Sequence, residues 1–444
     1  MPRKSFSYMS VLPEGLKPTR IEVDEQSGKI ESISGETAAV DASCVLFPGF
    51  MDIHVHAREF PRPVSGSDDL VEKWKSTCAK EVFSTADDAA INGGVTCFAA
   101  MPNDPDPPDN RVTFDRKRLI VGDCKCPVIL FALISEDSEP WADLPYKLYL
   151  DHSRSKLNFS SWQSVEDSLK RYRGQRVFFH AEDPDILKKN SEQHAHWKRR
   201  PPEAEIRAVS KILDLTHKYG LATHLCHIST ESAVRLISEY NDSASQKITC
   251  EVTPHHLFFS VDESHYLGAG HEILIPHYLL NCNPPIRSEQ DRLAMIEALR
   301  SGLVQVLASD HAPHTLTEKR QGVSGMPHLD TFGPFTGWLV KECEFSLGRI
   351  AEVISEEPYR IMGPNLAKKY GRVQEGYGAS FTVLDFTQKT SIGTVRDPNS
   401  NRRLFTRCGW SPFEHLSLPA YVKFTIIDGK VFNCSPDLTG SAKA

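Results

Sequence analysis

The polar and apolar positions divide this chain into short alternating segments near its start and longer apolar segments after residue 44. Residues 19–23 and 29–33 alternate apolar with polar side chains, which predicts two short strands. Eight apolar segments of strand length follow, and most end in a polar or ionisable side chain. These predicted strands are residues 45–56, 95–101, 128–134, 146–150, 176–180, 223–227, 248–252 and 304–310.

Segments with helical spacing separate most of these predicted strands. Apolar residues recur in them every three to four positions, as on the buried face of an amphipathic helix. The predicted helices are residues 69–90, 163–172, 203–219, 231–240, 288–300 and 347–362. Strands that alternate with helices form parallel sheets, and eight such units predict an α/β fold of the (β/α)8 TIM-barrel type. A doubly wound open sheet is the alternative.

The last part of the chain returns to strand patterns at residues 380–385 and 421–431, where Asp428-Gly429 is a hairpin signal. We expect these strands to pack with the early ones, so that the two ends of the chain form one small β-sandwich. The predicted domains are the N-terminal part of the sandwich (1–48), the barrel (49–371), and the C-terminal part of the sandwich with a tail (372–444).

The composition narrows the class of protein. Apolar residues make up 40% and charged residues 25% of the 444 positions, and no apolar run reaches the roughly 18 residues of a membrane span. The formal net charge of -7 argues against nucleic acid as a partner. Eleven cysteines, an odd number, predict buried thiols rather than a disulfide framework. The N-terminus lacks a secretory pattern, so we expect a cytoplasmic protein.

Candidate chemistry gathers at the C-terminal ends of the predicted strands, where barrel enzymes carry their active sites. In the first of them, Asp52, His54, His56 and Arg58 share one face, because alternate side chains of a strand point the same way. Neutral imidazole is the commonest metal ligand among side chains, so two histidines at this spacing predict a metal site. A strand with surface histidines is the alternative.

Later strands add Lys147, His180, His227 and Asp310 to this set. Four histidines can hold two divalent ions, but neighbouring dications need a bridging anion that offsets their repulsion. No carboxylate at a strand end obviously supplies one. A carbamate formed from the Lys147 amine and carbon dioxide would do so, although the residues alone favour a surface lysine.

Motifs along almost the whole chain resemble, in the same order, those of the dihydroorotases, which belong to the amidohydrolase superfamily. The superfamily shares a (β/α)8 barrel with metals at the strand ends. The motifs are Asp52-Ile-His-Val-His-Ala-Arg58, Met101-Pro-Asn103, Tyr146-Lys-Leu-Tyr149, His180-Ala-Glu182, His224-Leu-Cys-His227, Glu251-Val-Thr-Pro-His-His256, Asn283-Pro-Pro-Ile-Arg287 and Ala308-Ser-Asp-His-Ala-Pro-His314.

The resemblance implies a zinc-dependent enzyme that reversibly cyclises N-carbamoyl-L-aspartate to L-dihydroorotate in pyrimidine biosynthesis. Two Zn²⁺ ions would be bridged by carboxylated Lys147, and Asp310 would also transfer the proton. The implied metal ligands are His54, His56, Lys147, His180, His227 and Asp310. Arg58 and Asn103 resemble the residues that hold the substrate carboxylate, and the other implied substrate-binding residues are Asn283 and His314.

Three further features of the sequence concern the shape of the first loop, an extra ion and a closing loop. Ala57 and the segment after Arg58 depart from the usual family pattern, so the shape of the first loop is open. Cys226, Glu251 and His256 are potential ligands of an extra ion, although packing and contacts to the other ligands are the favoured roles, and His255 is ambiguous. Residues 151–159 occupy the place of a mobile loop that closes over substrate.

Two other functions stay open at this point. A hydantoinase or allantoinase would use the same barrel and metal bridge, but such relatives generally lack Arg58, Met101-Pro-Asn103 and the Asn283 motif. An inactive dihydroorotase-like domain would serve as a structural partner, for example of aspartate transcarbamoylase, although all the ligands are present. We expect an active homodimeric enzyme with a small-molecule substrate.

Overall fold

The computed structural model describes residues 3–36, 40–63, 68–150, 159–262, 265–269, 271–272, 275–392 and 400–434. Its centre is a ring of parallel strands. In chain order the ring contains β5 (Phe50–Val55), β6 (Val95–Ala100), β7 (Val128–Leu130) with β8 (Ala132–Leu133), β9 (Tyr146–Tyr149), β10 (Arg176–His180), β11 (Ala222–Leu225), β12 (Thr249–Val252) and β16 (Val306–Leu307).

The ring closes through two junctions. Strands β7 and β8 act as one, because Phe131 between them donates to the Ala100 carbonyl at 3.2 Å while β7 pairs with β6 and β8 with β9. At the other junction the chain after β16 pairs in parallel with β5: His56 N donates to the His311 carbonyl at 2.8 Å, and His311 N donates to the His54 carbonyl at 3.2 Å. The predicted barrel is therefore confirmed, and an open sheet is excluded.

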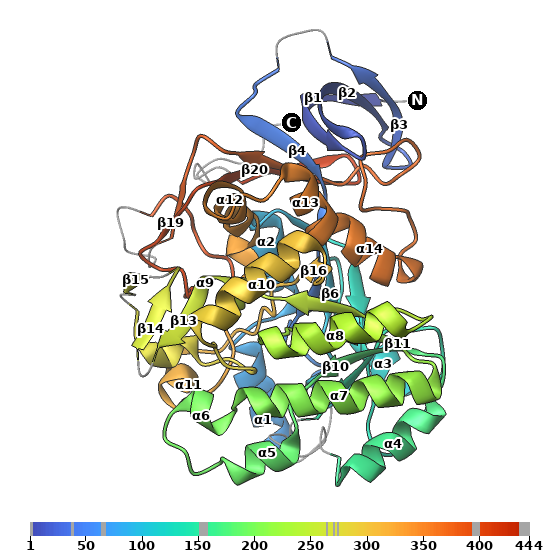
Figure 1. The fold of residues 1–444 in the computed structure, drawn as a ribbon. Coiled ribbons are helices and arrows are strands. Elements are labelled where there is room, and N and C mark those ends of the chain that lie inside the picture. The colour runs from blue at the N-terminus through green and yellow to red at the C-terminus, as the bar shows by residue number, and fades with distance from the viewer. Residues whose placement is uncertain are drawn as a thin grey trace.

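Helices cover the outside of the ring. Figure 1 shows α7 (Pro202–Tyr219), α8 (Glu231–Ser243) and α10 (Glu289–Ser301) along one side. The other long helices are α1 (Asp68–Cys78), α2 (Phe83–Asn92), α3 (Arg111–Ile120), α4 (Trp162–Arg171) and α12 (Phe332–Glu342). Shorter ones are α5 (Pro184–Lys189), α6 (His196–Arg199), α9 (Pro254–Phe258), α11 (Leu316–Arg320), α13 (Leu347–Ala351) and α14 (Glu357–Met362).

Two predicted elements are each interrupted in the structure, so the predictions of one continuous helix and one continuous strand are wrong. The predicted helix 69–90 is two helices, because Glu81 turns into the interior, where it accepts from Thr406 Oγ1 at 2.6 Å and from the backbone N of Arg407 at 3.2 Å. The predicted strand 45–56 breaks at Gly49, where a Cβ atom would overlap Thr96. Its first half, β4 (Cys44–Pro48), leaves the barrel for a second sheet.

That second sheet joins the two ends of the chain in the order β21-β20-β17-β4-β1-β2-β3. Its other strands are β1 (Arg3–Leu12), β2 (Gly15–Asp24), β3 (Lys29–Gly35), β17 (Phe381–Asp385), β20 (Tyr421–Ile427) and β21 (Lys430–Asn433). Phe6, Ile21, Phe381 and Ile426 share one core, so the sheet folds over itself as the predicted small sandwich. It lies at one end of the barrel (Figure 1), and the predicted domain boundaries stay predictions.

The hairpin predicted at Asp428-Gly429 is confirmed. It joins β20 to β21, and both residues have positive φ, 49° and 83°, as a two-residue turn of the favoured hand requires. Smaller sheets are formed by β13 (Phe259–Asp262), β14 (His265–Gly268) and β15 (His271–Glu272), and by β18 (Thr390–Ser391) and β19 (Ser417–Leu418). The predicted helix 347–362 contains a π-helical turn at Glu352–Glu356 between α13 and α14.

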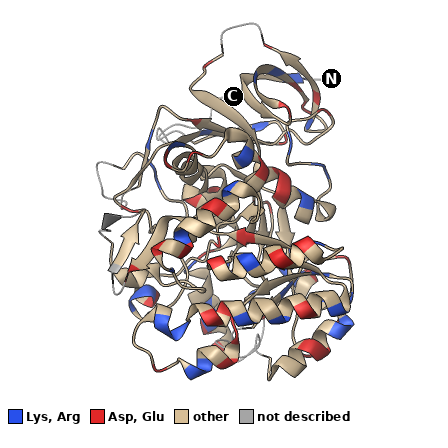
Figure 2. Cartoon of the chain, in the orientation of Figure 1, with Lys and Arg blue, Asp and Glu red and all other residues tan. Residues whose placement is uncertain are grey.

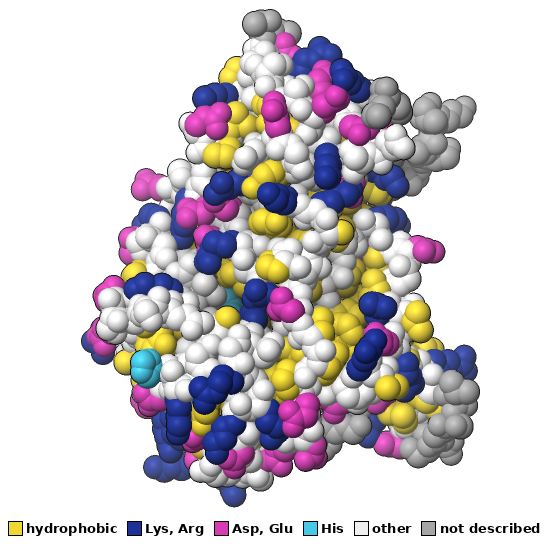
Figure 3. Space-filling model, turned by 90° about the vertical axis from the view of Figure 1, so that its right-hand side faces the viewer, with side chains coloured by type: hydrophobic (Ala, Val, Ile, Leu, Met, Phe, Trp, Pro, Cys, Tyr) yellow, Lys and Arg dark blue, Asp and Glu magenta, His cyan; other side chains and the backbone are white. Residues whose placement is uncertain are grey.

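The surface carries charges of both signs. Basic and acidic residues are interspersed along the outer helices in Figure 2, and Figure 3 shows side chains of both signs on the face turned by 90°. All eleven cysteines are free and most are buried, as predicted. Among the described residues, no helix is both long and apolar enough to cross a membrane.

Candidate active site

All six predicted metal ligands are buried in the barrel, at or near the C-terminal ends of its strands. Five of them, all except Lys147, fall into two groups that are joined through His54, whose ring centroid lies 5.2 Å from that of His227. His54, His56 and Asp310 form the first group, in which one ligand atom of each lies within 4.8 Å of the others. His180 and His227 form the second. The structure therefore brings together residues that lie up to 256 positions apart in the sequence.

Asp310 lies between His54 on β5 and His56, which directly follows that strand. Its Oδ1 atom lies 3.0 Å from His56 Nε2 and 3.3 Å from His54 Nε2. The opposite nitrogens are held by acceptors, since His54 Nδ1 contacts Glu251 Oε1 and His56 Nδ1 donates to Asn103 Oδ1 at 2.7 Å. Partners on the Nδ1 side leave both Nε2 atoms facing the Asp310 carboxylate, which is how metal-ligating histidines are usually oriented.

Charges in this group are strongly perturbed. Burial opposes a charge on His54, but the Glu251 and Asp310 carboxylates outweigh it and raise the pKa of His54 to about 10. Burial lowers the pKa of His56 to about 3. Although burial alone would raise the pKa of Asp310, its histidine neighbours lower it to about 2. Near pH 7 the Asp310 carboxylate is therefore ionised and the His56 imidazole neutral, the forms in which these groups bind a metal ion.

In the second group, two ring nitrogens converge. His180 Nδ1 lies 3.1 Å from His227 Nε2. Burial keeps the pKa of His227 well below its ordinary value, so its imidazole is neutral. Its Nδ1 atom is buried and has no hydrogen-bond partner among the described residues. Two buried imidazoles whose ring nitrogens face each other at this distance are suited to hold one cation between them.

Lys147 is fully buried on β9, which excludes the surface lysine that the residues alone favoured. Its Nζ atom donates to Cys226 Sγ at 2.8 Å and lies 5.1 Å from the centre of the Tyr149 ring. Its positive charge disfavours protonation of both His54 and His227, although the net pKa of His54 is still raised by the carboxylates around it. Lys147 thus lies within electrostatic reach of both histidine groups.

Two of the predicted substrate-binding residues contact each other. Arg58 Nη2 donates to His314 Nε2 at 3.0 Å, and His314 Nδ1 lies 3.2 Å from Glu318 Oε2. Burial and the Arg58 charge lower the pKa of His314 to about 2, so its imidazole is neutral. Asn103 reaches the site through His56. Asn283 has a buried Oδ1 atom without a hydrogen-bond partner among the described residues.

The backbone is strained at three of these positions. Arg58, His227 and Asp310 have φ values of 63°, 38° and 45°, in the left-handed region that residues other than glycine rarely occupy. Each lies just after a barrel strand. Such strain persists only where surrounding contacts fix it, and it is commonest at functional sites, which supports the placement of the site here.

Sequence reasoning missed the role of Glu182. This buried carboxylate lies 2.9 Å from His180 Nε2 and pairs with Arg200, whose Nε atom lies 3.1 Å away. Burial alone would raise the pKa of Glu182, but the charges of Arg200 and His180 hold it well below its ordinary value. The His180-Ala-Glu182 motif was the available signal, because a carboxylate two residues after a ligand can return to the same face.

Glu251 makes the contacts to other ligands that the sequence favoured. Besides His54, it accepts from His224 Nε2 at 3.1 Å and from the backbone N of His227 at 3.2 Å. One ligand atom each of His54, Cys226 and Glu251 also lies within 4.8 Å of the others, so an ion at this place stays a prediction. Of the predicted closing loop, residues 151–158 lie outside the described part of the chain.

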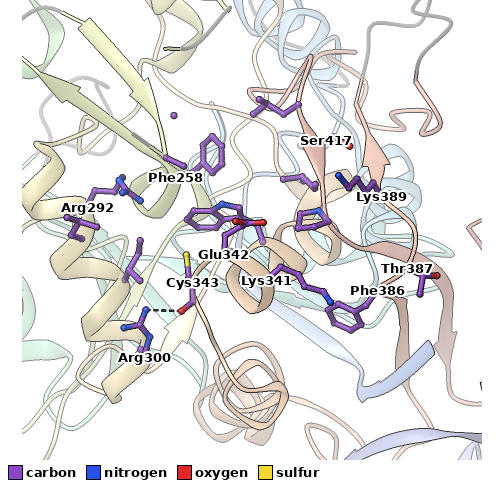
Figure 4. Close-up of a pocket in the computed structure, with 18 residues that line it drawn as sticks. Phe258, Arg292, Arg300, Lys341, Glu342, Cys343, Phe386, Thr387, Lys389 and Ser417 are labelled. Atoms are coloured by element: carbon purple, nitrogen blue, oxygen red, sulfur yellow. Dashed lines mark hydrogen bonds between the residues drawn. The ribbon is translucent and has the colours of Figure 1, made fainter. Parts of the chain in front are cut away.

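A hollow of about 760 Å³ lies elsewhere, between α10, α12 and the segment around β19 (Figure 4). Phe258, Arg292, Arg300 and Lys341 are among the residues that line it, and none of the candidate site residues does. It is therefore separate from the metal-ligand groups.

The chain matches the amidohydrolase family over residues 164–432. The dihydroorotase of Pyrococcus furiosus is 30% identical over 94% of this chain and 90% of its own length. That of Archaeoglobus fulgidus is 29% identical over 88% of each chain. Among solved structures, the L-hydantoinase (dihydropyrimidinase) of Arthrobacter aurescens shares the fold, with a TM-score of 0.79, 22% identity and coverage of 95% of this chain and 94% of that one.

The closed barrel with buried histidines, a lysine and an aspartate near its strand ends agrees with these matches, and the chain belongs to the amidohydrolase family. Within that family it groups with the dihydroorotases, which match it along almost its whole length.

Proposed function

We propose that this protein is a metal-dependent dihydroorotase, which interconverts L-dihydroorotate and N-carbamoyl-L-aspartate. The observation that carries the proposal is the hydrogen bond of 3.0 Å between Arg58 and His314. Arg58 lies two residues after the candidate metal ligand His56. Both compounds carry a carboxylate, which a planar guanidinium can bind through two parallel hydrogen bonds. The chain thus places an anion-binding cation directly beside a group able to hold a metal.

The donor set fits zinc. Imidazole nitrogens and carboxylate oxygens are its usual ligands, and the neutral state of His56 and His227 leaves lone pairs to donate. We propose that His54, His56 and Asp310 hold one Zn²⁺ ion and that His180 and His227 hold a second. Lys147, once carboxylated, would bridge them. Its burial and its electrostatic reach to both groups support that role.

When bound, the ions supply Lewis acidity, which polarises the ring amide carbonyl and lowers the pKa of water. The side chains do the rest. Arg58, which contacts His314, and Asn103, which contacts His56, hold the substrate carboxylate and so fix which carbonyl faces the histidines. Asp310 accepts the proton of the attacking water and delivers it to the ring nitrogen as the C–N bond breaks. Cyclisation reverses these steps, with Asp310 taking a proton from the carbamoyl nitrogen.

The substrate specificity of the purified protein tests the proposal. Purified protein loaded with Zn²⁺ is assayed on dihydroorotate, hydantoin and allantoin, before and after treatment with a chelator. We expect turnover of dihydroorotate that the chelator abolishes and added Zn²⁺ restores. Turnover of hydantoin or allantoin without turnover of dihydroorotate would assign the chain to the other cyclic amidohydrolases, and no turnover at all would favour an inactive structural partner.

The oligomeric state of the protein and its place in the cell are also proposals. We expect a homodimer in the cytoplasm, and association with aspartate transcarbamoylase is a further expectation. Size measurement of the purified protein, alone and mixed with that enzyme, tests both forms of assembly.

A further inference from the structure

A separate group of metal-ligating side chains lies beside the substrate-binding candidate Asn283. It consists of His255 and His256 on α9 and of Cys282. One ligand atom of each lies within 4.8 Å of the others, and the three residues are only 1–3% exposed. The group shares no residue with the two histidine groups of the candidate active site. The proposed reaction uses none of its side chains.

His255 and His328 each have one ring nitrogen without a hydrogen-bond partner among the described residues. His255 Nδ1 lies 3.0 Å from His328 Nε2, so one of the two rings donates to the other. Their outer nitrogens, His255 Nε2 and His328 Nδ1, are buried without partners among the described residues. Buried polar atoms are nearly always paired, because leaving one unpaired forfeits its hydrogen bond to water. If His255 is the donor, its Nε2 atom carries a buried, unused lone pair.

The imidazoles are in the form that binds metals. Burial lowers the pKa of His255 well below its ordinary value and that of His256 to about 4, so both are neutral near pH 7. A hydrogen bond from His255 Nδ1 to His328 would fix the ring as metal-ligating histidines are usually fixed. Burial raises the pKa of the Cys282 thiol, so binding there must displace its proton to solvent.

We propose that His255, His256 and Cys282 form an additional site for a borderline-soft transition-metal ion of the Zn²⁺ class. Imidazole and thiolate ligands favour such ions over Mg²⁺ and Ca²⁺. The ion forms bonds to two imidazole nitrogens and one thiolate sulfur, and one proton leaves the thiol. No oxidation or reduction is involved.

His256 limits the affinity of this site. Its Nδ1 atom lies 2.8 Å from Thr253 Oγ1 and its Nε2 atom donates to the Pro284 carbonyl at 3.1 Å. An ion must replace one of these contacts. Together with the proton released by Cys282, this exchange makes the site weaker than the proposed catalytic one and makes its affinity rise with pH. An occupied site would tie α9 to the segment that carries Asn283.

Cobalt substitution of the full-length protein tests the site, because a thiolate bound to Co²⁺ adds charge-transfer absorption in the near ultraviolet. Metal-free wild type, Cys282→Ser and Cys226→Ser are each loaded with Co²⁺, and zinc-loaded samples are analysed for ions per chain. We expect Cys282→Ser to lose charge-transfer absorption and one ion. Cys226→Ser is the matched control, because it removes another buried thiol that lies near a histidine, His54. It should retain the absorption that depends on Cys282.

Unchanged absorption and ion count in Cys282→Ser would overturn the proposal, as would absorption that disappears only in Cys226→Ser. Should Cys282→Ser fail to fold by circular dichroism, His255→Gln takes its place. This variant should bind one ion fewer than wild type and release fewer protons on loading, whereas an unchanged ion count would again overturn the site. Dihydroorotate turnover is measured in a separate assay. A result that disproves the additional metal site therefore does not affect the test of the proposed dihydroorotase activity.

Discussion

His180 and Glu182 are joined by a hydrogen bond of 2.9 Å from Nε2 to Oε2, and Arg200 holds the same carboxylate. Because a carboxylate oxygen only accepts, the bond requires a proton on His180 Nε2. The Nδ1 atom, on the other side of the ring, faces His227. A carboxylate in this position fixes the ring and makes it a stronger ligand.

Glu182→Gln should consequently weaken metal binding by about 10–100-fold at the His180 and His227 group, because the amide pairs poorly with Arg200 and supports the imidazole less. Titration of metal-free protein with Zn²⁺ measures the change. Glu166→Gln is the control, since its carboxylate pairs with Lys218 at 2.6 Å at the surface. Equal zinc affinity in the two variants would show that Glu182 does not position the ligand.

Lys147→Ala should lose both bound metal and activity, because the proposed carbamate neutralises the repulsion between two cations. A small added carboxylic acid should restore part of each by occupying the bridge. Elemental analysis and mass spectrometry measure ions per chain and the added carbon dioxide. Lys125→Ala, which removes a half-exposed lysine paired with Asp88 at 2.5 Å, should change neither. Full metal content in Lys147→Ala would assign the bridge to another residue.

Asp310→Asn should fold and keep its metal but lower kcat by about 10²–10⁴-fold, because an amide cannot accept the proton that a general base must take. Steady-state kinetics with metal analysis of the same sample measures this. Asp88→Asn serves as the exposed control. Turnover near that of the wild type would remove Asp310 from proton transfer.

Arg58→Lys should raise KM for dihydroorotate by roughly tenfold or more, although the positive charge is kept. An ammonium cannot reproduce the two-pronged contact, and a hydrogen bond to a charged group contributes about 1.5–3 kcal/mol. Arg235→Lys, on the exposed face of α8, is the matched substitution. If both variants share the wild-type KM, the carboxylate is held elsewhere.

The carboxyl of Glu205 gives a pH dependence of stability. Burial raises its pKa from about 4.5 to about 7, against the opposing charge of Arg287, while Glu182 adds to the rise. Ser229 and Thr230 donate to it at 2.6–3.1 Å. As pH rises from about 4.5 to 7, the unfolded chain loses this proton before the native state does. Native stability should therefore fall across that window, by up to about 3 kcal/mol.

Glu205→Gln removes this titration. The difference in Tm, variant minus wild type, should be more positive at pH 8 than at pH 5, as measured by thermal unfolding at both values. Glu203→Gln, at an exposed position of the same helix, should show no such change. A difference that is constant with pH would mean that Glu205 ionises in the native protein as it does in the unfolded chain.

Local sequence patterns determined much of this protein. Apolar segments of strand length located the barrel strands. The period of two placed His54 and His56 on one face, because neighbouring side chains of a strand must point to opposite sides. The Asp428-Gly429 turn followed for a similar reason, since few residues other than glycine and Asp or Asn accept positive φ. The motif order also indicated the family, and most of the candidate ligands came with it.

Only the tertiary structure decided which atoms meet. His54 and Glu251 are 197 positions apart, and their contact determines which nitrogen of His54 faces Asp310. The burial of Lys147, the clamp of Arg200 on Glu182 and the inward turn of Glu81 that divides a predicted helix likewise depend on distant segments. Periodicity records which face a side chain occupies, whereas hydrogen-bond partners and local charge arise only when the barrel closes and brings its strand ends together.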